Sequence, residues 1–166
     1  MRTEPQPGLG GEAAHLAAYL SFYRETVVEK CRSLSTAQLR TSRVPSGWTP
    51  VELLSHLAHM ERRWLVWGFL GEQVDEPWGD GEDRWQVPDD RTLDDVVGLL
   101  REVAGRTDAV LRETPLETMA LPSGRFGEDE APPDLRWICF HVVQEYARHA
   151  GHLDVAVELA GGHVGE

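Results

Sequence analysis

The sequence is short of basic residues and contains no long apolar segment. Its 166 residues include 16 basic and 28 acidic side chains, which gives a net charge of −12. Surfaces that bind nucleic acid or anionic lipid are basic, so this balance argues against both as partners. The longest apolar run, WLVWGFL at 64–70, is far too short to span a bilayer, and the N-terminal MRTEPQPGLGGEAA lacks the apolar core of a secretion signal. We therefore expect a soluble, cytoplasmic protein with no membrane or nucleic-acid partner.

Cysteines are scarce and strand patterns are absent. The two cysteines, Cys31 and Cys139, are too few for a disulfide-stabilised scaffold and lack the CxxC spacing of metal or redox sites. We expect both to be small buried side chains in a reducing compartment.

No segment alternates apolar and polar residues with the period of a strand, and no internal repeat occurs. A chain of this length can bury a single core, so residues 1–166 are expected to form one domain.

Amphipathic helical periodicity dominates instead. Apolar residues recur at steps of three and four in four segments, which are separated by stretches rich in glycine, proline and acid. Four helices with one apolar stripe each bury these stripes most simply as an all-α four-helix bundle. The expected helices cover residues 12–34, 49–70, 92–113 and 134–160. Residues 1–11 are expected to be flexible and residues 71–91 to form a loop long enough to suggest a functional role.

Polar side chains interrupt the apolar stripe of the last predicted helix. With about 100° of rotation per residue, His141, Glu145, His149 and His152 fall on one narrow face, which periodicity also identifies as the buried face. The second predicted helix repeats this pattern with His56 at the centre of its apolar stripe. Burying imidazoles and a carboxylate without partners costs several kcal/mol, so they must be ion-paired, hydrogen-bonded or metal-bound.

The spacing of these residues favours a metal site. Glu145 and His149, at i and i+4, can hold one ion from one helix face, and His56 is the obvious third ligand. Two imidazoles and one carboxylate leave at least one coordination position open, as catalytic sites do. One divalent ion is therefore expected, zinc first, with nickel, manganese or iron compatible with the same ligands. The alternative is a hydrogen-bonded network of core side chains.

Two segments carry a resemblance to a known family. GWTPVELLSHLAHMERRW at 47–64 and DLRWICFHVVQEYARHAGHLD at 134–154, together with the four-helix pattern, closely resemble the DinB-like superfamily. Within it they are most similar to the actinobacterial branch that includes mycothiol-dependent enzymes such as maleylpyruvate isomerase. The resemblance implies a four-helix bundle that holds a divalent ion at His56, Glu145 and His149.

The sequence also departs from the family pattern. Many relatives have arginine at the position of Ala150, and glutamine is common at the position of His152. We further expect no room in the chain for the additional carboxy-terminal domain that the isomerase carries. The isomerase activity itself is therefore not expected.

The activity that the resemblance implies is thiol transfer. A low-molecular-weight thiol, mycothiol in actinobacteria, would bind the open metal position as a thiolate and attack a small electrophile such as an epoxide, halide or activated alkene. His152 or His141 would move a proton or orient a ligand, and Arg63 would pair with a carboxylate on the thiol or substrate. Plain packing is the alternative for the two histidines, and solvent exposure is the alternative for the arginine.

Two other functions are compatible with this scaffold. Water in the open metal position would give metal-assisted hydrolysis. In a non-catalytic bundle the ion would serve stability or partner binding. In a catalytic or a non-catalytic bundle, the residues that would line a homodimer interface or cover a pocket are Trp64, Trp67, Trp78 and Trp85, and plain core packing is the alternative for them. Ferritin-like di-iron chemistry is excluded because it needs two ExxH motifs and further glutamates, and only residues 12–15 fit.

Overall fold

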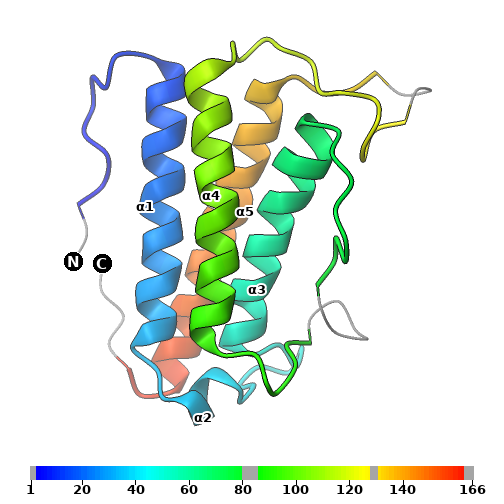
Figure 1. Cartoon of the computed structure of the whole chain (residues 1–166). Helices are drawn as coiled ribbons and strands as arrows, with labels where there is room; N and C mark the ends of the chain where they lie inside the picture. Colours follow the sequence, from blue (N-terminus) through cyan, green and yellow to red (C-terminus); the bar gives the residue numbers. More distant parts are fainter. Residues whose placement is uncertain (1–2, 80–85, 128–130, 163–166) are drawn as a thin grey trace.

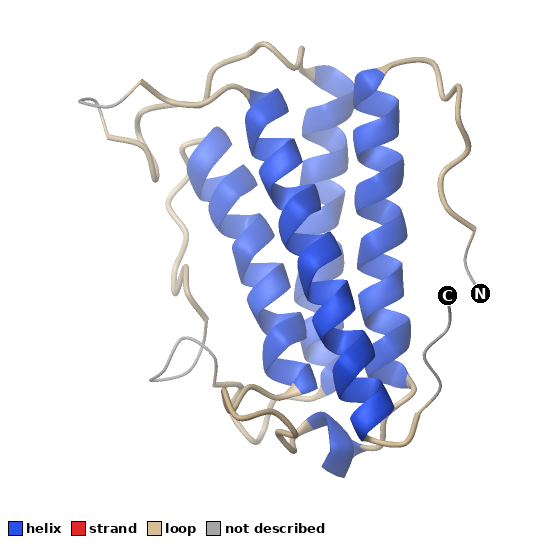
Figure 2. Ribbon diagram, turned by 180° about the vertical axis from the view of Figure 1, so that it is seen from behind, coloured by secondary structure: helices blue, strands red, loops and turns tan. Residues whose placement is uncertain are grey.

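The computed structural model describes residues 3–79, 86–127 and 131–162. The elements are α1 (Glu12–Arg32), α2 (Thr36–Leu39), α3 (Pro50–Glu61), η1 (Arg62–Phe69), α4 (Leu93–Glu113) and α5 (Leu135–Leu159). The long helical segments pack side by side, and the short α2 lies at one end of the bundle (Figure 1, Figure 2). The described residues contain no strand, only one isolated β-bridge between Met119 and Asp134. The predicted fold class, an all-α four-helix bundle, is confirmed.

Side-chain caps fix where two of the long helices begin. Thr49 and Thr92 each accept a hydrogen bond from the backbone N–H three residues on, and Glu52 and Asp95 complete the two capping boxes. The first helix ends at Arg32, slightly before the predicted end. The short α2 was not predicted, because a capped helix of 4 residues is too short to show a helical period. No helix among the described residues is long and apolar enough to cross a bilayer.

The long loop predicted after the second helix is tied to the bundle by arginines. Its described parts, residues 71–79 and 86–91, have no regular structure, while residues 80–85 lie outside the described residues. Arg62 Nη2 donates to the carbonyl oxygen of Glu76 (2.8 Å), and Arg40 Nη2 donates to that of Pro88 (3.0 Å). Both described parts of the loop are therefore held by hydrogen bonds to side chains from the bundle.

The second long helical segment changes character along its length. Periodicity predicted a single α-helix to residue 70, but residues 62–69 form the π-helix η1. The last turn of η1 holds the irregular segment that precedes α5, because the backbone N–H groups of Arg125 and Leu121 donate to the carbonyl oxygens of Trp67 (3.2 Å) and Phe69 (3.0 Å). π-Helical turns are uncommon and concentrate at functional sites.

A buried carboxylate joins the four long segments of the bundle. Glu61, at the end of α3, is fully buried and accepts hydrogen bonds from Arg24 of α1 (2.5 and 3.1 Å), Thr107 of α4 (2.5 Å) and Tyr146 of α5 (2.7 Å). Arg24 also donates to Asp108 (2.9 Å). Because a buried charge is tolerated only when it is paired and hydrogen-bonded, these contacts fix the rotation of the helices that supply them.

The pKa values of the two main donors reflect this burial. Burial opposes the charge of Arg24, but the charge and hydrogen bonds of Glu61 outweigh it and hold the pKa of Arg24 above its ordinary value. Burial, followed by the charge of Glu61, raises the pKa of the Tyr146 hydroxyl well above its ordinary value. At neutral pH the arginine is therefore charged and the tyrosine keeps its proton, so both can donate to Glu61.

Replacing Arg24 should destabilise the fold strongly. Arg24→Met leaves the buried Glu61 without its guanidinium, which we expect to lower the free energy of unfolding by about 3–5 kcal/mol. The matched control, Arg106→Met, removes an exposed ion pair with Glu72 (2.8 Å) and should cost less than about 1 kcal/mol. Urea unfolding followed by circular dichroism measures both losses. Equal losses for the two variants would contradict a central role for the Glu61 network.

Candidate metal centre

The three predicted ligands meet between α3 and α5. Glu145 Oε2 lies 3.4 Å from His149 Nε2 and 3.8 Å from His56 Nε2. One donor atom from each of the three residues lies within 4.8 Å of the other two. The structure therefore brings together the pair spaced by four on α5 and the histidine from α3, while their role as metal ligands stays a prediction.

This set of donors fits a divalent ion. Tetrahedral ligand bonds of about 2.1 Å place neighbouring donor atoms about 3.4 Å apart, so the observed separations need only small side-chain adjustments. The side chains of His56, Glu145 and His149 are 17%, 16% and 10% exposed, so solvent reaches the cluster. A cluster that solvent can reach suits a site with an open coordination position better than a closed structural site.

Burial keeps the two candidate histidine ligands neutral. Burial, followed by the charges of His149 and Arg63, lowers the pKa of His56 to about 3. Burial also lowers the pKa of His149. Both rings are therefore neutral at pH 7, and a neutral imidazole has the lone pair that a metal ion requires.

His152 is an exposed residue whose ring contacts that of His149. The prediction that it lies on the buried face is wrong, because its side chain is exposed. Its Nδ1 atom lies 3.1 Å from Nδ1 of His149, and its ring lies 6.1 Å from that of Trp48. A hydrogen bond at Nδ1 of His149 leaves its Nε2 atom directed at Glu145. Nε2 is the nitrogen with which His149 would bind a metal ion beside Glu145.

The buried face of α5 is rotated from the predicted one. Val142 and Tyr146 are fully buried, whereas His141 and Glu145 are only partly buried. The reason is the hydrogen bond to Glu61, which holds Tyr146 at the centre of the bundle and leaves the preceding side chain about 100° away. The candidate ligands thus lie at the margin of the core rather than at its centre.

His141 lies one turn of α5 before Glu145, among aromatic rings. Its ring centroid is 4.2 Å from that of Trp64, and it stacks on Trp137 with 5.5 Å between centroids and 11° between planes. Burial lowers the pKa of His141, so its ring is neutral at pH 7. A neutral imidazole at this position can accept a proton next to the cluster.

Arg63 is buried and positions the segment that follows η1. Its Nη1 donates to the carbonyl oxygen of Pro77 (3.0 Å), and its guanidinium lies 4.4 Å from the centre of a Trp78 ring. Its charge contributes to the low pKa of His56, which places it near the cluster. The pairing of Arg63 with a substrate carboxylate stays a prediction, and Trp85 lies outside the described residues.

Sequence reasoning missed the Glu61 network. A signal was present, because Arg24 and Glu61 each lie one turn from a buried leucine, Leu20 and Leu57, within an apolar stripe. A charged residue at such a position must have a partner in the interior. The sequence of one helix does not show which other helix supplies that partner.

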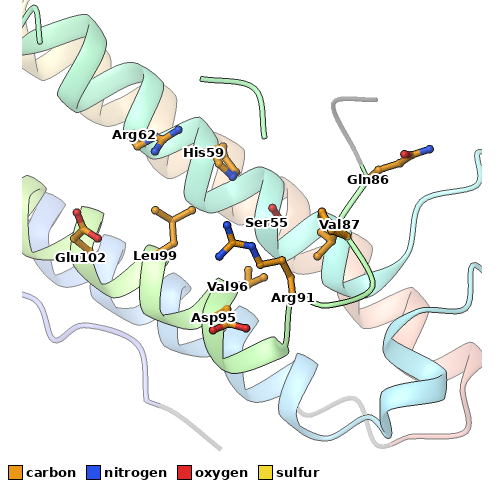
Figure 3. Close-up of a pocket in the computed structure, with 11 residues that line it drawn as sticks. Ser55, His59, Arg62, Gln86, Val87, Arg91, Asp95, Val96, Leu99 and Glu102 are labelled. Atoms are coloured by element: carbon orange, nitrogen blue, oxygen red, sulfur yellow. The ribbon is translucent and has the colours of Figure 1, made fainter. Parts of the chain in front are cut away.

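A separate cavity lies between α3 and α4 (Figure 3). Its volume is about 320 Å³, and Ser55 and His59 of α3 line it opposite Val96 and Leu99 of α4. His59 is fully buried and is not part of the cluster of three candidate ligands. His56 does not line this cavity, so the cavity is distinct from the candidate metal centre.

The fold and the ligand cluster together define a class of protein. A four-helix bundle with a histidine, glutamate and histidine cluster between two of its helices is the arrangement that the resemblance to the DinB-like superfamily implies. The family model described as Mycothiol-S-transferase matches residues 15–162. The chain therefore belongs to the mycothiol S-transferase family of that superfamily, as the resemblance indicated. A search of curated proteins found no match.

Removing either candidate histidine ligand should abolish metal retention. Purified without chelator, the wild-type protein should hold about one divalent ion per chain, and His56→Ala and His149→Ala should hold almost none. His152→Ala, which removes only the support of His149, should weaken metal affinity by about 10- to 100-fold. Elemental mass spectrometry and competition with a chelator measure the two effects.

Two histidine variants serve as controls for metal retention. His15 is only partly buried and bonds to the backbone of Gly11, and His59 lies outside the cluster, so His15→Ala and His59→Ala should both retain the ion. Circular dichroism shows whether each variant is folded. Retention of the ion by folded His56→Ala and His149→Ala would refute the ligand assignment.

Neither cysteine should react in the native protein. Cys31 and Cys139 are both buried, and burial raises the pKa of each thiol to about 12. Both are therefore neutral thiols at pH 7, without the thiolate that reacts with a disulfide reagent. We expect Ellman's reagent to label neither in buffer and both after unfolding in urea. Fast labelling of the folded protein would show that one of them is accessible.

Proposed function

We propose that this protein is a metal-dependent mycothiol S-transferase that joins mycothiol to a small electrophile. The observation that carries the proposal is the solvent-accessible cluster of His56, Glu145 and His149 in a member of the mycothiol S-transferase family. Zinc is the ion that fits these ligands first, and nickel, manganese and iron also accept such a set.

Each residue of the cluster has a defined role in this proposal. A bound divalent ion lowers the pKa of a coordinating thiol and so supplies a thiolate nucleophile at neutral pH. His56 and His149 provide neutral ring nitrogens, and Glu145 provides negative charge. His152 orients His149 through the contact between their Nδ1 atoms (3.1 Å). His141 can receive the proton that the thiol releases.

The burial of the cysteines supports an external thiol. Cys31 and Cys139 are buried and neutral, so neither can act as the nucleophile of a transfer reaction. The sulfur must then belong to a small molecule that reaches the exposed side of the cluster. Metal-assisted hydrolysis and a non-catalytic, dimeric bundle are the alternatives that an assay must separate.

The zinc-loaded protein should form a thioether from mycothiol and a reactive electrophile. We expect His149→Ala to lower kcat/KM by at least about 100-fold, because it removes a ligand, and His152→Ala to lower it by about 10- to 100-fold. Epoxides, alkyl halides and activated alkenes are tested in turn, and mass spectrometry identifies the thioether.

His15, which lies outside the cluster, gives the control, since His15→Ala should keep wild-type activity. Cleavage of an ester or amide without any thiol would favour hydrolysis. If the zinc-loaded protein forms no thioether with any of the three electrophile classes, the transferase proposal is wrong.

A further inference from the structure

An aromatic cluster lies beside the candidate metal centre. The Trp64 ring centroid of η1 is 4.2 Å from that of His141, 5.6 Å from that of Trp137 and 6.0 Å from that of Phe126. Because His141 is one turn from Glu145, the cluster extends from the candidate ligands toward the start of α5. Trp137 is 52% exposed, so the cluster is open to solvent.

Two cavities flank Trp137. One, of about 440 Å³, is lined by Trp64, Phe126 and Pro133 among others, and the second, of about 410 Å³, is lined by residues that include Phe140. Cavities of this size hold compounds with one or two rings. Asp134 lines both cavities as well, but the aromatic side chains in their walls favour planar aromatic ligands, because rings stack on one another or meet edge to face.

Arg125 adds a positive charge to this surface. Its guanidinium lies 4.2 Å from the centre of a Trp64 ring, and burial lowers its pKa. The pKa of His141 is lowered by burial first and, to a smaller extent, by the charge of Arg125. Arg125 therefore lies near the His141 ring as well. Among the described residues, no carboxylate forms an ion pair with Arg125. A partly desolvated guanidinium beside aromatic rings favours a ligand that carries an anionic group.

The loop that carries Arg125 and Phe126 is held tightly against η1. The Arg125 N–H donates to the carbonyl oxygen of Trp67 (3.2 Å). A Cβ atom on Gly124 would lie 1.8 Å from that oxygen and 2.9 Å from Gly71 Cα, so this close approach requires glycine. The backbone that carries these two side chains is therefore fixed before any ligand binds, which lowers the entropic cost of binding.

We propose that the aromatic surface formed by Trp64, Phe126, Trp137 and Arg125 selects the electrophile, and that the electrophile is a planar aromatic compound with an acidic substituent. This inference rests on the proposed thiol transfer. The ring packs against the tryptophans, and the acidic group pairs with Arg125. An electrophile that is aliphatic or uncharged lacks one or both of these contacts.

For a benzylic halide the reaction is a simple substitution. The thiol loses its proton, and its sulfur attacks the carbon attached to the ring. A carbon–sulfur bond forms while the carbon–halogen bond breaks, and the halide leaves with the bonding electron pair. The products are a thioether, a halide ion and a proton, so the step needs neither an oxidant nor a reductant.

Four bromides separate the effect of the ring from that of the charge. The compound 4-(bromomethyl)benzoate has both features, benzyl bromide has only the ring, 4-bromobut-2-enoate has only the carboxylate, and allyl bromide has neither. For the zinc-loaded protein with mycothiol, kcat/KM is divided by the uncatalysed rate constant of each compound. We expect this ratio to be highest for 4-(bromomethyl)benzoate, by at least about tenfold.

Two variants test the two contacts separately. Arg125→Gln should lower the ratio about 10- to 100-fold for 4-(bromomethyl)benzoate and leave benzyl bromide within about twofold. Trp137→Ala should lower it about 3- to 10-fold for both ring compounds. The controls Arg112→Gln and Leu159→Ala remove an exposed arginine and an exposed apolar side chain elsewhere, so they should change neither ratio.

Binding of the unreactive 4-methylbenzoate, measured by calorimetry, separates failure of this inference from failure of the transferase proposal. We expect the wild type to bind it and Arg125→Gln and Trp137→Ala to bind it more weakly. Thioether formation without preference for rings or acids, or binding that neither variant weakens, overturns the inference alone. Binding that depends on both residues, without thioether from any bromide, overturns the transferase proposal alone. Absence of both overturns both.

Discussion

The carboxylate of Glu61 is fully buried, and three other helices are arranged to satisfy it. Its hydrogen-bond donors come from α1, α4 and α5. Each of these helices must therefore be rotated about its own axis so that its donor reaches the carboxylate. The consequence is clearest for α5. With Tyr146 held against Glu61, the preceding Glu145 points about 100° away, toward the seam with α3 where His56 lies. The candidate metal centre thus depends on a hydrogen-bond network that supplies none of its ligands.

The carboxylates of Glu61 and Glu145 have different electrostatic surroundings. Glu61 lies in the interior against the guanidinium of Arg24, which offsets its charge. Glu145 lies at the margin of the core against His56 and His149, whose pKa values are lowered by burial, so these two neighbours are neutral at pH 7. A divalent cation would supply the positive charge that the two imidazoles do not. Glu61 therefore stabilises the fold, because its cation is a side chain of the same protein. Glu145 suits a ligand site, because its cation must come from solution.

The helices and the candidate ligands could be predicted because their signals are local. Each long helix carries an apolar stripe, a pair spaced by four lies on one helix, and one histidine interrupts the stripe of another. The Glu61 network could not be predicted in this way because it depends on contacts between helices. Arg24 is 37 residues and Tyr146 is 85 residues away from Glu61 in the sequence. His152 was placed wrongly for the same reason, because the rotation of α5 is set by a partner helix and not by its own period.

The π-helix η1 connects the candidate ligands to the aromatic surface. A rotation of about 100° per residue applies up to Glu61, but hydrogen bonds from i to i+5 turn each later residue through a smaller angle, so a helical period cannot place the rings that follow. Trp64 contacts α5 from η1, and the carbonyl of Trp67 holds the loop that carries Arg125. The candidate ligands come from α3 and α5, whereas much of the aromatic surface comes from η1 and this loop. If the proposed thiol transfer takes place, a scaffold divided in this way allows substitutions in residues 121–126 to change the preferred electrophile while His56, Glu145 and His149 keep their positions.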